Sequence, residues 1–276
     1  MMTVRRFFQQ PKMILVCIII IFLLFLIAIL APWLAPNNPT VVNLSMKLQA
    51  PSLDYPLGTD HLGRCNLSRL LIGMRISLGF ASLIFISSLV IGLVIGTIAG
   101  YIGGWFDYTL MRICDTVMAF PNLLLVIGLV GMFGPGLTQV VTALILVQWV
   151  YYARIFRGMV INLKAENYIT AAQISGSSSW KIMKKHIVPN VLPPLVVMGT
   201  LEMGWAIMNI SSVSFLGLGV QAPTPEWGAM ILEGKSFVRS NPELMLYPGL
   251  CIMLVVIVFN LLGESLSEHL GVKRRF

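Results

Sequence analysis

Long runs without a charged side chain constrain the fold of this chain more than any other feature. No Asp, Glu, Lys or Arg occurs in the four stretches Met13–Ala31, Ile76–Phe106, Thr116–Ala153 and Leu244–Gly263. A helix of roughly 20 apolar residues is long enough to cross the hydrocarbon core of a bilayer. The composition agrees, because 57% of the 276 residues are hydrophobic and only 11% are charged. The chain is therefore predicted to be an all-α membrane protein that crosses the bilayer several times.

Six transmembrane helices are predicted from these runs and their interruptions. The run Thr116–Ala153 contains Gly134-Pro135-Gly136, a strong turn signal, so it divides into two spans joined by a tight hairpin. The first of these two spans begins near Ile113. A further span covers Val191–Ser214 and is interrupted only by the acid Glu202.

The distribution of charge predicts the orientation of the chain. A net charge of +8 could indicate nucleic-acid binding, but a topology with both termini inside places most of the 19 basic residues in inside segments. We therefore expect cytoplasmic N- and C-termini, a lipid bilayer around the chain, and no nucleic acid partner. The first apolar run is too long for the core of a signal peptide, so it is predicted to remain as the first span.

The sequence contains no catalytic motif. It lacks HExxH, GxSxG and a phosphate-binding Walker A loop. The histidines His61, His186 and His269 lie in three separate segments, and the four cysteines form no CxxC pair. We expect no catalytic residue, no metal site and no enzymatic activity in the chain itself.

An acid inside a membrane span is costly and is a candidate for a transport pathway. Glu202 lies within the fifth predicted span, with Met203 and Met208 close by in sequence. One interpretation is that these three residues line a passage for a cationic or amine-bearing substrate. The alternative is that Glu202 hydrogen-bonds a neighbouring helix. Asp115 is expected to form an i,i+3 salt bridge with Arg112 instead.

Two other regions carry structural expectations. Residues 40–75 are predicted to lie outside the membrane and to end in an amphipathic helix, with Arg64 and Arg69 among its apolar residues, that leads into the second span. This divides the chain into an N-terminal part, residues 1–75, and a five-helix core, residues 76–276. Gly92, Gly96 and Gly100 form a small-residue ladder typical of close helix packing.

The longest polar interruption in the C-terminal half is Glu166–Asn190. Its pattern predicts two short surface helices separated by Gly176, the second beginning near Trp180 and ending at Pro189. A face with Tyr168 and two alanines would be offered to solvent. Such a stretch is either a folded connector or a docking surface for another protein, and its length favours docking, since most connections have only about 4–6 residues.

The spacing of small residues in this stretch resembles the EAA loop of permease subunits in bacterial ABC importers. That loop reads E-A-A-x3-G-x9-I-x-L-P, and here Ala171-Ala172-x3-Gly176-x12-Pro189 follows it, with Thr170 in place of Glu. The other departures resemble the dipeptide, oligopeptide and nickel branch, whose loops read like E-Y-x-x-A-A-x3-G and end H-I-x-P-N. The counterparts in this chain are Glu166, Tyr168, Ala171, Ala172, Gly176, His186, Ile187, Pro189 and Asn190.

Two more stretches resemble the same branch. They are LGTDHLGR at Leu57–Arg64, followed by SRLLIGMRISL, and SFLGLGVQAPTPEWG at Ser214–Gly228. The resemblance covers nearly the whole chain, in order. Cys65 stands where that branch usually has Asp.

The resemblance implies a type I ABC importer permease fold with six transmembrane helices in the bacterial cytoplasmic (inner) membrane. It also implies a second homologous permease subunit, two cytoplasmic ATPase subunits and an external substrate-binding protein as partners. ATP would be used by the ATPases, and the chain itself would bind no cofactor. The ATPase-coupling loop would be residues 160–190, with these coupling residues: Glu166, Tyr168, Ala171, Ala172, Gly176, His186 and Pro189.

The resemblance leaves two classes of cargo open. The stretches Trp149–Arg154, Thr200–Gly204 and Ala222–Gly228 look closer to nickel-type permeases. The expected cargo is therefore nickel, cobalt or a metal chelate, and the alternative is a dipeptide or oligopeptide. An intramembrane enzyme and a channel acting alone are the competing classes of function, and neither has a motif in its favour.

Overall fold

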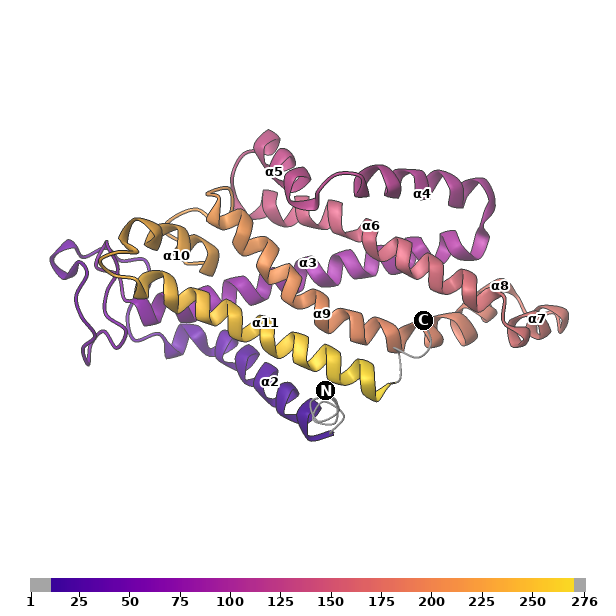
Figure 1. Ribbon diagram of the computed structural model, residues 1–276, viewed down its shortest axis with the longest axis horizontal. Coiled ribbons are helices and arrows are strands. Elements are labelled where there is room, and N and C mark those ends of the chain that lie inside the picture. The colour runs from indigo at the N-terminus through magenta and orange to yellow at the C-terminus, as the bar shows by residue number, and fades with distance from the viewer. Residues whose placement is uncertain (1–10, 271–276) are drawn as a thin grey trace.

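The computed structural model describes residues 11–270, and these residues form helices without a β-strand (Figure 1). The α-helices are α2 (Pro11–Leu34), α3 (Asn66–Ile102), α4 (Gly104–Met118), α5 (Asn122–Phe133), α6 (Leu137–Lys164), α7 (Asn167–Ile174), α8 (Ser179–Ile182), α9 (Val188–Phe215), α10 (Trp227–Gly234) and α11 (Glu243–His269). Short 3₁₀ turns occur at Leu44–Met46 and Lys235–Phe237, and a π-helical turn at Met183–Ile187 joins α8 to α9. The predicted all-α class is confirmed.

Within residues 11–270, five helices are long and apolar enough to cross a membrane: α2, α3, α6, α9 counted with α8 and the turn between them, and α11. Helices α4 and α5 reach that length only together, and they are bent by 88° at their junction. Pro121 lies at the junction, and proline lacks the N–H that a continuing helix needs. The span expected to begin near Ile113 is therefore a broken pair of helices, and its helix α4 already begins at Gly104.

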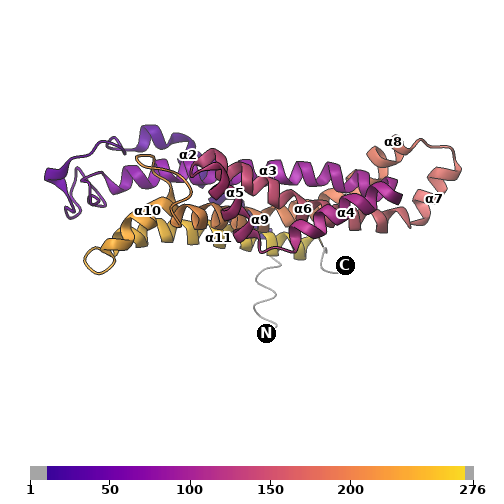
Figure 2. The ribbon, with the colours of Figure 1, turned by 90° about the horizontal axis from the view of Figure 1, so that it is seen from above.

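The ends of the helices show that the chain crosses the bundle in alternating directions. Lys164 at the end of α6 donates a hydrogen bond of 2.7 Å to the carbonyl of Tyr101 at the end of α3, and α7 and α8 project beyond this end (Figure 2). At the opposite end, the N–H of Gly136, just before α6, donates to the carbonyl of Leu218, just after α9, at 3.1 Å. Because α3 ends at one end and α6 begins at the other, α4 and α5 together make one crossing.

Helices α3 and α6 pack closely along the glycine ladder. A Cβ atom added to Gly92 would lie 2.8 Å from the carbonyl oxygen of Trp149, and one added to Gly100 would lie 2.9 Å from that of Arg157. A Cβ on Gly96 would overlap the backbone of Ala153. The predicted packing role of this ladder is confirmed, because only a hydrogen side chain leaves room for the two backbones.

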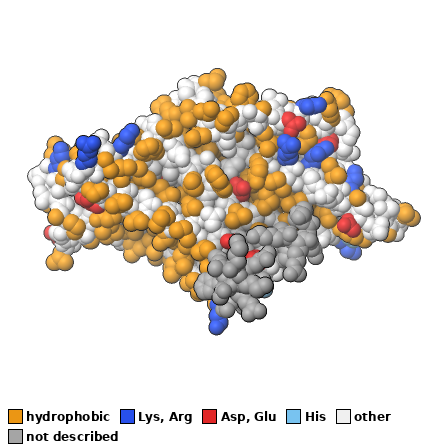
Figure 3. All heavy atoms as spheres, viewed as in Figure 1, with side chains coloured by type: hydrophobic (Ala, Val, Ile, Leu, Met, Phe, Trp, Pro, Cys, Tyr) orange, Lys and Arg blue, Asp and Glu red, His pale blue; other side chains and the backbone are white. Residues whose placement is uncertain are grey.

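Helix α10 fills the space between α3, α9 and α11 at the end opposite α7 and α8 (Figure 1). Trp227 at its start is fully buried, and its indole N–H donates to the carbonyl of Leu70 at 3.2 Å. The visible face of the molecule is mostly hydrophobic in its middle, and Lys and Arg side chains lie mainly toward its two ends (Figure 3). This pattern fits a bundle embedded in a bilayer.

The segment before α3 differs from the predicted amphipathic surface helix. Helix α3 is continuous from Asn66, so the boundary expected at residue 75 falls inside one helix. Arg64 and Arg69 are only 2% and 1% exposed, and both pair with Glu233 of α10, at 2.6 Å and 2.8 Å. Arg64 also pairs with Asp60 at 2.6 Å. The arginines therefore hold the segment before α3 against α10 rather than facing water.

Candidate functional site

The polar stretch after α6 is an ordered element fixed to the bundle by apolar side chains. Ile169 of α7, Ile182 of α8 and Ile187 of the π-helical turn are buried with Tyr152 and Phe156 of α6. Ser178 caps α8, since its side-chain oxygen accepts a hydrogen bond from the N–H of Lys181 at 3.4 Å. The second short helix does not end at Pro189, because Pro189 lies in the first turn of α9, where a missing N–H costs nothing.

Gly176 makes the turn between α7 and α8 with a φ of +75°, a conformation that favours glycine. The break predicted at this position is therefore present. The two predicted alanines face different ways: Ala171 is exposed, whereas Ala172 packs partly against the buried cluster around Ile169. The outward surface of this loop thus offers one alanine rather than two.

Two large apolar side chains at the tip of the loop were not singled out from the sequence. Ile174 is 83% exposed and Trp180 is 71% exposed, on either side of the Gly176 turn. Tyr168, also exposed, lies beside His186 with ring centroids 6.0 Å apart, and Glu166 is the exposed residue before α7. Apolar side chains this exposed on an ordered polar loop are typical of a protein-binding surface. The sequence signal that could have singled out these two side chains is their position on either side of Gly176.

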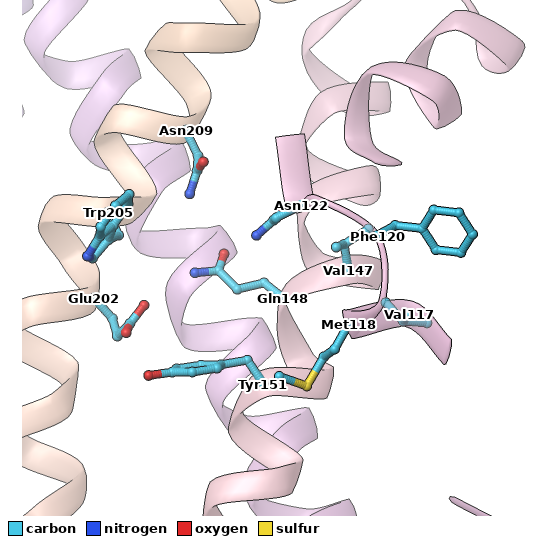
Figure 4. A pocket seen from close by; sticks show the side chains of 10 residues that line it. All are labelled: Val117, Met118, Phe120, Asn122, Val147, Gln148, Tyr151, Glu202, Trp205 and Asn209. Carbon is cyan, nitrogen blue, oxygen red and sulfur yellow. The ribbon is translucent and has the colours of Figure 1, made fainter. Parts of the chain in front are cut away.

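A pocket of about 450 Å³ opens between α6, α9 and the break between α4 and α5 (Figure 4). Glu202, Trp205 and Asn209 line it from α9 because residues spaced by three and four share one helix face. The remaining lining residues are Val117, Met118, Phe120, Asn122, Val147, Gln148 and Tyr151. The pocket is thus mixed in character, with amides, aromatic rings and one carboxylate.

A short chain of hydrogen bonds holds Glu202 at the pocket wall. The hydroxyl of Tyr152 donates to Oε2 of Glu202 at 3.3 Å, and Nε2 of Gln148 donates to that hydroxyl at 3.4 Å. Gln148 is only 5% exposed, and its Oε1 has no hydrogen-bond partner within residues 11–270. Glu202 thus hydrogen-bonds a neighbouring helix, as one interpretation of the sequence expected, and it also lines a cavity.

The two methionines expected beside Glu202 lie elsewhere. Met203 is 4% exposed in the core between α2, α3, α9 and α11. Met208 lines a separate groove with Phe215 and Ile252. Successive residues of a helix are turned by about 100°, so residues 202, 203 and 208 cannot share a face. The structure therefore does not bring Glu202, Met203 and Met208 together as one pathway or metal-binding set.

Asp115 is also paired differently from the expectation. Its carboxylate lies 3.0 Å from Nη1 of Arg154 on α6, whereas the guanidinium of Arg112 lies over the ring of Tyr108 at 5.0 Å. The predicted i,i+3 pair is therefore wrong. An acid on α4 can reach α6 because the two helices run side by side, as the ion pair of Asp107 with Arg157 at 2.5 Å also shows.

Asp60, His61 and Glu233 place potential metal ligands within 4.8 Å of one another. Their carboxylates already pair with Arg64 and Arg69, so the cluster is neutralised by protein cations. Burial beside Phe237, whose ring stacks on that of His61, lowers the pKa of the imidazole. We interpret the cluster as a structural ion network.

Comparison with known proteins places the chain in a family. Residues 92–275 match the family described as "Binding-protein-dependent transport system inner membrane component", and residues 2–51 match "N-terminal TM domain of oligopeptide transport permease C". The chain is 40% identical over 253 residues to the nickel transport system permease protein NikC of Escherichia coli K12, covering 92% of this chain and 91% of that protein.

Two other relatives are about equally similar. The dipeptide transport system permease protein DppC of Alkalihalophilus pseudofirmus is 40% identical over 267 residues, covering 97% of this chain and 88% of the relative. The glutathione transport system permease protein GsiD of Escherichia coli O6:K15:H31 is 39% identical over 272 residues, covering 97% and 89%. Among solved structures, an inward-facing MetNI methionine ABC transporter matches with a TM-score of 0.56 and 19% identity, over 72% of this chain and 94% of that one.

Proposed function

The chain belongs to the family of binding-protein-dependent transport system inner membrane components, as an ABC importer permease of the dipeptide, oligopeptide and nickel branch, and from this premise we propose how it works. It forms the solute pathway together with a second homologous permease. Two cytoplasmic ATPases bind ATP and supply the energy, and an external binding protein delivers the solute. The chain itself binds no cofactor and catalyses no reaction.

The observation that carries this proposal is the tip of the loop between α6 and α9. Trp180 and Ile174 project beyond the bundle on a scaffold that Ile169, Ile182 and Ile187 fix to it. A rigid loop can transmit a movement of its docked partner to α6 and α9, whereas a loosely attached loop would absorb it. We assign residues 160–190 as the ATPase-coupling loop, with Trp180 and Ile174 as its principal contacts.

We propose accordingly that the loop and both termini lie in the cytoplasm. The loop itself carries the basic residues Lys181, Lys184 and Lys185. The positive-inside rule associates such basic segments with the cytoplasmic side. The external segment before α3, together with α10, then lies outside, where a binding protein would reach it.

Two classes of cargo remain candidates: nickel, cobalt or a metal chelate, and a dipeptide or oligopeptide. Relatives named for nickel, for dipeptide and for glutathione are 40%, 40% and 39% identical to this chain, so overall similarity does not separate them. Within this chain, the pocket around Glu202 is the feature to compare between relatives.

Co-purification and uptake test the proposal. The tagged chain, expressed with its neighbouring transport genes, should purify with a second permease and two ATPases. Proteoliposomes of that complex should take up solute only with ATP and binding protein. Trp180→Ala should weaken ATPase binding by about tenfold or more, because exposed aromatic anchors commonly contribute at least about 2 kcal/mol at interfaces.

Trp33 supplies the matched control, since it is 77% exposed at the end of α2, far from the loop. Trp33→Ala should leave ATPase binding unchanged. A chain that purifies alone and conducts solute without ATP would refute the importer function, and equal ATPase loss in both variants would refute the role of Trp180.

A further inference from the structure

The hydrogen-bond chain at the pocket wall fixes which donors and acceptors of Gln148, Tyr152 and Glu202 are already used. A carboxylate can only accept, so the single O–H of Tyr152 is committed to Glu202. The oxygen of Tyr152 must then accept from Gln148, which places the amide nitrogen of Gln148 on Tyr152 and leaves its Oε1 free.

On the wall formed by α6 and α9, Glu202 and Gln148 contribute acceptors and Tyr151 and Trp205 contribute aromatic faces, and the amides of Asn122 and Asn209 complete the polar lining. Figure 4 shows the side chains of Gln148 and Glu202 pointing into the same space from α6 and α9. Gln148 Oε1 is buried without a partner within residues 11–270, and an unpaired buried acceptor costs about 1–3 kcal/mol. The rings of Tyr151 and Trp205 also line the cavity, and they remain exposed. A ligand that brings N–H donors and a positive charge would satisfy all four groups.

From this geometry we propose that the pocket binds the primary ammonium group of an organic solute, such as the N-terminus of a short peptide, as it passes through the permease. An ammonium carries three N–H donors and one positive charge. It can donate to the carboxylate of Glu202 and to Oε1 of Gln148 while its charge lies against Tyr151 and Trp205, where cations are attracted to the ring faces. The inference rests on the proposed function, because it assigns this pocket to the pathway of the importer.

A bare nickel ion fits the same pocket poorly. Nickel favours imidazole nitrogen, whereas amide and carboxylate oxygens suit harder cations. The described lining contains neither His nor Cys, and its one thioether, Met118, lies 3.9 Å from the guanidinium of Arg154. The charge of Arg154 is itself paired with Asp115, which leaves Glu202 as the pocket's unpaired charge. The chemistry of the pocket therefore favours the peptide alternative over a bare metal ion.

The test uses the assembled permease–ATPase complex in nanodiscs, without nucleotide or binding protein, so that only the permease pathway is measured. The probes are dialanine, N-acetyl-dialanine and Ni²⁺. Saturation-transfer NMR should detect dialanine, and the signal should fall about tenfold for N-acetyl-dialanine, because hydrogen bonds to a charged group contribute about 1.5–3 kcal/mol and a tenfold change needs about 1.4.

Substitutions in the pocket test whether dialanine binds there. Glu202→Gln and Gln148→Leu should each reduce the dialanine signal to that of N-acetyl-dialanine. Glu243→Gln is the matched control, since Glu243 begins α11 and lies outside the pocket, and it should retain the signal. Co-purification of the ATPases with each variant reports whether it is folded and assembled.

Three outcomes would overturn the inference: equal signals for dialanine and its acetylated form, an unchanged signal in Glu202→Gln, or Ni²⁺ binding in equilibrium dialysis that Glu202→Gln abolishes. ATP-dependent uptake by the same complex distinguishes failure of the proposed ammonium site from failure of the proposed importer function. Intact uptake with any of these outcomes refutes the ammonium site alone, whereas uptake that does not depend on ATP refutes the importer function.

Discussion

Glu226 and Glu202 are both acids in apolar surroundings, but they meet different partners. Glu226 is fully buried and accepts hydrogen bonds from Ser77 at 3.0 Å, from Ser211 at 3.4 Å and from the N–H of Ala229 at 3.0 Å. Its acceptor sites are filled by protein donors on three elements, so we interpret it as a structural residue that holds α10 in place. Glu202 instead faces a cavity, which makes it the candidate to meet a solute.

At the scale of single residues, Gly176 is the clearest test of coupling. Gly176→Val forces a β-branched side chain into a φ of +75°, which costs about 1–2 kcal/mol and should shift the tip that carries Trp180. We expect normal membrane insertion with ATP-driven uptake reduced at least about tenfold, a cost of about 1.4 kcal/mol in coupling. Uptake and ATP hydrolysis are measured together in proteoliposomes.

Gly103 serves as the control for Gly176, because it has a similar φ of +72° and open space around it, but lies between α3 and α4. Gly103→Val should insert and transport at a rate close to that of the wild type. Unchanged uptake in Gly176→Val would remove the turn from the coupling path.

At the scale of elements, the contact between α3 and α6 leaves little room for any side chain larger than hydrogen. It positions Tyr152, which lies against Gly92 and hydrogen-bonds Glu202, and Gln148, which lies one turn earlier on α6 and lines the pocket. The backbones approach so closely that the ladder tolerates no added carbon. The pocket therefore depends on the packing of α6 against α3, although no residue of α3 lines it.

Gly96→Leu should separate the two helices, because the new side chain would overlap the backbone of Ala153. Overpacking costs typically about 1–3 kcal/mol and more where backbone blocks relaxation. We expect a lower thermal midpoint for the purified complex and loss of uptake. Gly79→Leu on the same helix, with no atom within 4 Å of the added Cβ, should change neither measurement. Equal stability of the two variants would contradict this packing.

The ion network of Asp60, Arg64, Arg69 and Glu233 joins the external segment to α10. Glu233→Gln would leave two buried guanidinium groups with one acid between them, and breaking such a pair costs about 3–5 kcal/mol. We expect the segment before α3 to become sensitive to protease added outside. The exposed Glu166→Gln is the control, and protease resistance equal to that of the wild type in Glu233→Gln would show that the network does not hold the segment.

At the scale of the whole molecule, the helices run in alternating directions, so the segments between them gather at two opposite ends (Figure 1). The proposed coupling loop lies at one end, and α10 with the segment before α3 lies at the other (Figure 1). The pocket around Glu202 lies between them, beside the break of α4 and α5. A movement at the loop can therefore reach the pocket along α6 and α9 without passing through the external end.

The proposed orientation can be measured with a membrane-impermeant thiol reagent. In intact cells, Lys47→Cys should be labelled, whereas Lys185→Cys should react only after the membrane is opened, because the two positions lie at opposite ends. Background should be low, since Cys17, Cys65 and Cys114 are buried and Cys251 is half-buried. The reverse labelling pattern would invert the topology and exclude cytoplasmic docking at α7 and α8.

The membrane helices, the turn at Gly134–Gly136, the glycine ladder and the break at Gly176 could all be predicted from the sequence. The physical reason is that each is local. The length of an apolar run decides whether a helix crosses a bilayer, and a glycine with its neighbours decides a turn or a close approach. The resemblance of the loop at residues 160–190 identified the family for a similar reason, because a docking surface made of one continuous segment leaves its spacing in the sequence.

Which way each side chain faces was decided only by tertiary structure. Arg69 meets Glu233, 164 residues away, and Tyr152 meets Glu202, 50 residues away. The bend between α4 and α5 breaks the span expected to begin near Ile113 and makes it one wall of the pocket, and Met203 is directed into the core. Sequence determined that this chain spans a membrane and carries a folded loop broken at Gly176, because hydrophobic length and local turns need no partner. Packing between distant helices decided which acid faces the cavity, because burial and hydrogen bonding depend on neighbours that folding supplies.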